Sequence, residues 1–197
     1  MTTRMESRGD RMLLNWLWDI VAVDGKIAAG IRKKRSLLVS PFIVLIAAQI
    51  HGFTAFYCNI AFASGQVNLT EAAFYFVFGY MAMIASQLGI SLLLWVMGRL
   101  LGGKASRFID VFIAAGYAFL PYGILAAANT YYRYAGQDAS FSSNTLPVII
   151  MVAAFAYFTY LLTRVLHLLT GFTIRRAFAC VAAAFVFITS FVYLFGY

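Results

Sequence analysis

Charged residues are scarce in this sequence. Only 11% of the 197 residues are Asp, Glu, Lys or Arg, whereas a soluble domain averages about a quarter. Apolar residues make up 63% of the chain and form runs long enough to cross a bilayer. The formal charge of +8 does not indicate nucleic-acid binding, because the cations separate apolar runs instead of gathering on a water-soluble face. The composition predicts an integral membrane protein with no nucleic-acid partner.

Catalytic and metal-binding patterns are also missing. The sequence has no GxSxG elbow, HExxH pair, Walker loop or paired carboxylates. The middle of every apolar run lacks Asp, Glu, Lys and Arg, which argues against a transporter built on a central carboxylate. Cys58 and Cys180 lie in separate apolar runs, where they are expected to be buried small side chains. We expect no enzymatic activity, catalytic residue, metal or cofactor.

Five apolar runs are long enough to be membrane-spanning helices. They cover residues 37–63, 72–98, 109–130, 146–169 and 177–197. Each run is continuous instead of alternating, and an open sheet would leave backbone groups unpaired in lipid. The predicted fold class is therefore all-α, with residues 37–197 forming a polytopic bundle of five transmembrane spans.

The distribution of Lys and Arg predicts the orientation of the bundle. Eight of these residues precede the first run, three follow the second, and three lie at and after the end of the fourth. The opposite side has only Arg133. Because positive loops stay in the cytoplasm, we expect a cytoplasmic N-terminus and an external or lumenal C-terminus.

Residues 1–36 form a separate cytoplasmic segment in this prediction. Apolar side chains recur at roughly helical spacing from Leu13 to Ile31, which indicates an amphipathic helix lying in the membrane interface. A basic cluster follows it, made of Arg32, Lys33, Lys34 and Arg35. This cluster is a candidate contact for anionic lipid head groups or a protein partner, and fixing the topology is its alternative role.

The hinge after the second run is rich in glycine. Gly102 and Gly103 precede Lys104, but the GxxxxGK[ST] spacing and the preceding strand of a phosphate-binding loop are missing. We therefore interpret the hinge as a tight cytoplasmic turn.

The third run contains small residues and a proline. Gly116 and Gly123 are seven residues apart, which places them on one helix face where another helix can approach closely. Pro121 is expected to kink the run near its middle, which would leave the Tyr117 carbonyl without its usual partner. A polar side chain from a neighbouring helix is then expected to bond that carbonyl.

These motifs resemble the Yip1 domain family. The similar stretches are "GRLLGGKAS", which begins at residue 98, "GYAFLP" at residues 116–121, and the arginine-bearing turn "TGFTIRRAF" before the last run. The motif residues are Gly98, Gly102, Gly103, Gly116, Tyr117 and Pro121. The resemblance implies a non-enzymatic protein with five spans and a cytoplasmic N-terminus. Eukaryotic members are adaptors in vesicle traffic that engage prenylated Rab GTPases, but their long, often acidic N-terminal region is replaced here by a short basic one. The resemblance therefore implies a compact, prokaryotic-type member.

Two functional hypotheses follow. The first is a membrane scaffold or adaptor for membrane organisation or trafficking-like processes, located in the plasma or inner membrane if the protein is prokaryotic. Its expected partners are anionic lipid head groups, other membrane proteins or a second copy of the chain. The alternative is a small-solute permease or channel, suggested by the polar residues His51, Ser86, Gln87 and Ser91 within apolar runs, together with the proline-broken third run.

Overall fold

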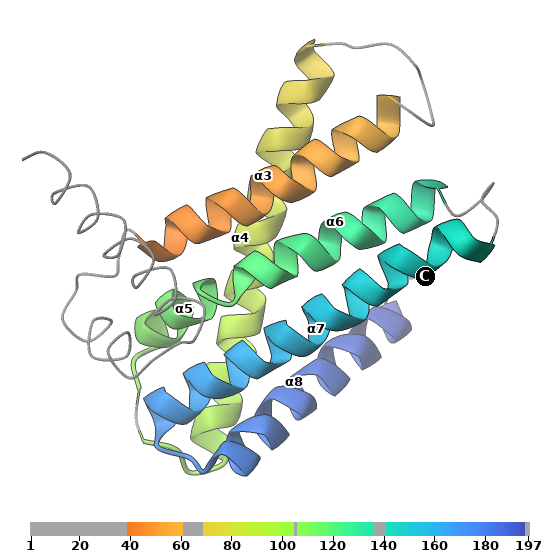
Figure 1. The fold of residues 1–197 in the computed structure, drawn as a ribbon. Coiled ribbons are helices and arrows are strands. Elements are labelled where there is room, and N and C mark those ends of the chain that lie inside the picture. Colours follow the sequence, from red (N-terminus) through yellow and green to blue (C-terminus); the bar gives the residue numbers. More distant parts are fainter. Residues whose placement is uncertain (1–38, 61–68, 105, 136–140, 196–197) are drawn as a thin grey trace, which may run out of the picture.

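The computed structural model describes residues 39–60, 69–104, 106–135 and 141–195, and these residues contain no strand (Figure 1). The six described helices are α3 (Val39–Asn59), α4 (Leu69–Leu100), α5 (Phe108–Gly116), α6 (Phe119–Ala135), α7 (Phe141–Thr170) and α8 (Ile174–Phe195). The all-α prediction is confirmed for this part of the chain. The interfacial helix and the basic cluster Arg32, Lys33, Lys34 and Arg35 lie outside the described residues.

Several of these helices are long and apolar enough to cross a membrane. Helices α3, α4 and α7 qualify individually, and α5 with α6 makes a fourth candidate if the bent pair is one span. The fifth predicted span corresponds to α8. The last two residues of that predicted span, 196 and 197, lie outside the described part. A bundle with three or four candidate spans is therefore established, and five spans stay a prediction.

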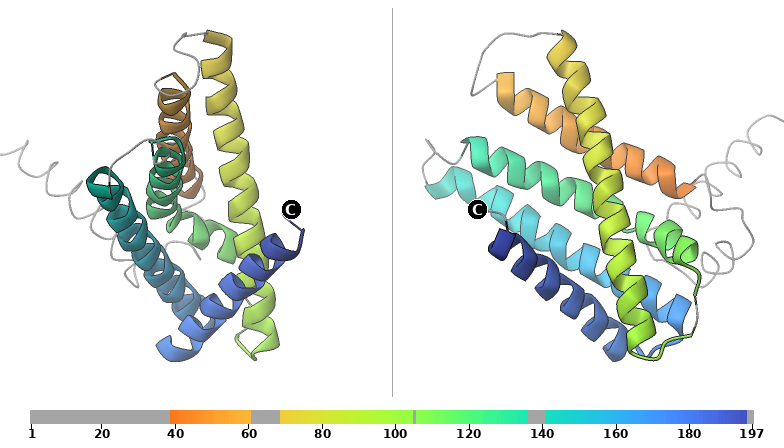
Figure 2. Two further views of the ribbon diagram at one scale, coloured as in Figure 1. Left: turned by 90° about the vertical axis from the view of Figure 1, so that its right-hand side faces the viewer. Right: turned by 180° about the vertical axis from the view of Figure 1, so that it is seen from behind.

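Three helices lie side by side, and the other long helices pack around them. Helices α3, α6 and α7 follow one another in that order, α4 crosses behind them, and α8 packs against α7 and runs back toward α4 (Figures 1 and 2). The start of α3, the end of α4, α5 and the α7–α8 turn lie toward one side of the molecule (Figure 1). The opposite helix ends lie toward the other side, as the predicted alternation of crossings requires. Which side is cytoplasmic stays a prediction.

Small side chains dominate the tightest part of the core. Ala47 and Ala48 of α3 have no exposed surface, and neither do Ala115 and Ala118 beside the break between α5 and α6. Helices in lipid associate through close packing, so residues without bulky side chains bring their backbones together. Cys58 and Cys180 are buried and free, as the sequence predicts.

Candidate functional site

The third predicted span is broken into two helices. Helices α5 and α6 meet at an angle of 56°. The Tyr117 N–H donates to the Ala114 carbonyl oxygen at 3.2 Å, which tightens the end of α5. Pro121 lies in the first turn of α6, where its missing N–H would lack a helical partner in any case. The expected kink near the middle of the run is confirmed, and the structure adds that the helix breaks there: α6 begins at Phe119, two residues before Pro121.

A buried glutamine bonds the backbone beside this break. Gln87 of α4 is only 2% exposed, and its Nε2 donates to the Phe112 carbonyl oxygen at 2.8 Å. The same nitrogen lies 3.5 Å from the Ser40 hydroxyl oxygen of α3. The sequence predicted a polar side chain from a neighbouring helix at this break and expected it at the Tyr117 carbonyl, whereas Gln87 bonds the Phe112 carbonyl oxygen. Gln87 thereby links α3, α4 and α5.

The two glycines of the broken span both pack against α3. A Cβ atom at Gly116 would overlap the Ser40 hydroxyl oxygen and lie 2.8 Å from Gln87 Nε2. A Cβ atom at Gly123 would lie 2.7 Å from both the Cα and the Cβ of Ala47. Because α5 ends at Gly116, the two glycines do not share one continuous helix face as predicted. The predicted close approach of another helix is nevertheless present at both positions.

The glycine-rich hinge ends α4 and is a tight turn, as predicted. Gly102 has a φ of 76°, a left-handed conformation that favours glycine. The Gly103 N–H donates to the Gly98 carbonyl oxygen at 2.8 Å, and a Cβ at Gly103 would lie 2.7 Å from that oxygen. The Lys104 N–H then donates to the Thr170 carbonyl oxygen at 2.9 Å. This last bond fixes the hinge to the end of α7.

The α7–α8 turn is held by bonds of its own. Gly171 has a φ of 71°, and its N–H donates to the His167 carbonyl oxygen at 3.1 Å. His167 Nδ1 is hydrogen-bonded to the Phe172 carbonyl oxygen. The Thr173 hydroxyl oxygen accepts a bond from the Arg176 N–H at 3.4 Å and so caps the start of α8. We call residues 101–104 and 170–173 the paired turns.

A basic hollow lies at the paired turns. It has a volume of about 730 Å³. Its lining residues are Gly102, Lys104, Thr170, Gly171, Phe172, Thr173, Arg175 and Arg176. Sequence reasoning placed the three cations among them on one side of the membrane but did not bring them together. The sequence pattern that could have predicted the hollow is that both turns combine glycine with basic residues, in "GGK" and "TGFTIRR".

The polar residues that suggested a permease do not share one set of contacts. Gln87 is bonded at the helix break, and the Ser86 hydroxyl oxygen lies 3.5 Å from the Tyr122 hydroxyl. Within the described part of the chain, His51 Nδ1 and Ser91 Oγ are buried and have no hydrogen-bond partner. At least one of these residues, Gln87, therefore holds helices together instead of lining a shared polar path.

Comparison with known proteins agrees with these motifs. The model of the Yip1 domain matches residues 18–196, which is nearly the whole chain. Neither the curated proteins nor the solved structures contain a match. The domain match and the long apolar helices together indicate a multi-pass membrane protein. The chain belongs to the Yip1 domain family.

Proposed function

We propose that this protein is a non-enzymatic membrane scaffold or adaptor with five spans, a cytoplasmic N-terminus and an external or lumenal C-terminus. The supporting observation is how the motif glycines are used. Gly116 lets α3 pack closely on the broken span, as the neighbouring Gly123 outside the motif also does, and Gly102 and Gly103 form the turn that joins α4 to the α7–α8 turn. These positions build the bundle, so the family motif is explained by architecture without any reaction.

The proposed partners are other membrane proteins or a second copy of the chain. A scaffold needs a rigid framework that presents a defined surface, and the paired turns supply one through the Lys104–Thr170 backbone bond. Three cations stand at this end, and positive charge is expected on the cytoplasmic side. The plasma or inner membrane is the proposed location for a prokaryotic-type member.

Cross-linking in the native membrane tests this proposal. The full chain is cross-linked in intact membranes and then recovered by gentle solubilisation, beside an unrelated multi-pass protein expressed at the same level. We expect a reproducible cross-linked partner or homo-oligomer that the control protein does not capture. Recovery of the isolated monomer alone would refute the scaffold.

A flux measurement distinguishes the permease alternative. Sealed vesicles containing the purified chain are compared with empty vesicles across a panel of ions and small polar solutes. A scaffold leaves the vesicles impermeable. Solute entry that depends on the protein would replace the scaffold proposal with the permease.

A further inference from the structure

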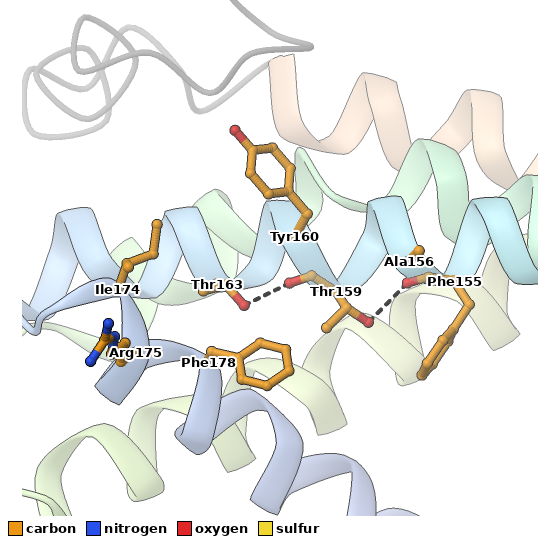
Figure 3. Close-up of a pocket in the computed structure, with 8 residues that line it drawn as sticks. All are labelled: Phe155, Ala156, Thr159, Tyr160, Thr163, Ile174, Arg175 and Phe178. Carbon is orange, nitrogen blue, oxygen red and sulfur yellow. Dashed lines mark hydrogen bonds between the residues drawn. The ribbon is translucent and has the colours of Figure 1, made fainter.

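An apolar groove runs from the basic hollow along the surface of the bundle. It lies between α7 and α8 and has a volume of about 620 Å³ (Figure 3). Its lining residues are Phe155, Ala156, Thr159, Tyr160, Thr163, Ile174, Arg175 and Phe178. Arg175 lines both the groove and the basic hollow. The two spaces therefore adjoin at this arginine.

The two threonine hydroxyls inside the groove are already hydrogen-bonded. The Thr159 hydroxyl donates to the Phe155 carbonyl oxygen, and the Thr163 hydroxyl donates to the Thr159 carbonyl oxygen, both at 2.8 Å (Figure 3). Both bonds return to the backbone of α7, so the hydroxyls need nothing from an occupant. The groove consequently offers hydrocarbon contact along its length and positive charge at its Arg175 end (Figure 3).

The described lining of the basic hollow carries positive charge without a counter-charge. Lys104, Arg175 and Arg176 line it, and none of the described lining residues is acidic. Asp110 is the one acidic residue whose side chain the structure describes, and it lies outside this lining. Three cations brought together by the paired turns favour a phosphate group, whose oxygens accept charge-assisted hydrogen bonds.

We propose that the hollow and the groove form one site for an anionic phospholipid. The head-group phosphate binds Lys104, Arg175 and Arg176, and one acyl chain lies between α7 and α8. From Thr163 to Phe155 the groove follows nine residues of α7, whose eight steps make about 12 Å of helix leading away from the charge. A phospholipid has an anionic head group followed by an acyl chain, which matches the basic hollow followed by the apolar groove. Basic pockets between spans at the cytoplasmic side bind such head groups. The inference goes beyond the proposed scaffold, and its site is built from other residues than the Arg32–Arg35 cluster.

The test measures lipid binding to the purified full chain. The protein is prepared in a neutral detergent, and dioleoyl phosphatidylglycerol and dioleoyl phosphatidylcholine are titrated while bound lipid is counted by native mass spectrometry. We expect one saturable site that prefers the anionic lipid. Inorganic phosphate and glycerol phosphate are used as competitors, because a site that needs the acyl chain holds these soluble anions far more weakly.

Two variants address the two halves of the site separately. Arg175→Gln with Arg176→Gln removes two phosphate contacts, and we expect phosphatidylglycerol binding to weaken by about tenfold or more. Ala156→Phe fills the groove without changing charge, and we expect a comparable loss. The matched controls are Arg107→Gln, in the same hinge but outside the lining, and Ala153→Phe, an exposed alanine of α7 outside the lining. All four proteins are checked by size-exclusion chromatography and circular dichroism.

Each outcome decides the proposal. Loss of binding in both site variants and retention in both controls supports it. Unchanged binding in the arginine variant would refute the phosphate site, and unchanged binding in Ala156→Phe would refute the acyl-chain groove. Competition by glycerol phosphate at the concentration of the lipid would identify a soluble anion as the ligand and overturn the lipid assignment. Because the readout is lipid and not a protein partner, failure here is distinguishable from failure of the scaffold.

Discussion

Replacing Gly123 with alanine should force α3 and α6 apart. The new Cβ would lie 2.7 Å from the Cα and Cβ of Ala47 and 2.8 Å from its carbonyl oxygen. Non-bonded carbon atoms are comfortable at about 3.5–4.0 Å, so the helices must separate by about 1 Å. Two of the three obstructing atoms are backbone and cannot rotate away. Overpacking of this kind costs about 1–3 kcal/mol.

Gly89→Ala is the matched control for this variant. Gly89 is also a helical glycine, but a Cβ there would meet nothing within 4 Å. Both substitutions gain the same helix propensity, so their difference isolates the cost of the contact with Ala47. At about 2–4 °C per kcal/mol for a chain of this size, the melting temperature of Gly123→Ala should be about 2–12 °C below that of Gly89→Ala.

Thermal unfolding of the two purified variants in the same detergent measures this difference. The loss of the monodisperse size-exclusion peak after heating gives each melting temperature. Adding Ala47→Gly to Gly123→Ala should recover part of the loss, because it removes one of the three close atoms. Equal melting temperatures for Gly123→Ala and Gly89→Ala would refute the close packing of α3 on α6.

Three further predictions concern the hinge and the break. Gln87→Met leaves the Phe112 carbonyl oxygen without this bond and should lower stability by about 1–3 kcal/mol in the same thermal assay; an unchanged melting temperature would show that the bond is dispensable. Gly102→Ala places a side chain at a φ of 76° and should cost about 1–2 kcal/mol, whereas a stabilised variant would contradict the left-handed turn. The double variant Gly116→Leu with Pro121→Leu should reduce the amount of protein in the membrane fraction on immunoblots, and wild-type abundance would contradict an architectural role for the motif.

Much of the helix arrangement could be predicted from local sequence. Apolar runs locate the helices because a span needs length and hydropathy, and α3, α4 and α7 begin and end within a few residues of the expected positions. Pro121 and Gly102 act through their own backbone conformations, so the break and the hinge were also visible. Local chemistry was sufficient for these features.

The long-range contacts could not be predicted in the same way. The sequence of an apolar run does not predict that Gly123 faces Ala47. Every neighbouring helix is equally hydrophobic, so the fit of their shapes determines which helices pair. The Lys104–Thr170 bond joins residues 66 positions apart and depends on how α4 and α7 end in space. The basic hollow was missed for this reason, although each of its cations had been counted.

The bent pair is the point on which the whole architecture depends, since α5 with α6 is either one crossing or a re-entrant loop. Cysteine labelling decides between them in sealed membranes, using Arg107→Cys before the pair and Tyr132→Cys near its end, both exposed positions. The background chain carries Cys58→Ala and Cys180→Ala, which removes the two native thiols. An impermeant maleimide should reach position 107 only from the cytoplasmic side and position 132 only from the opposite side. Labelling of both positions from the same side would contradict the five-span account.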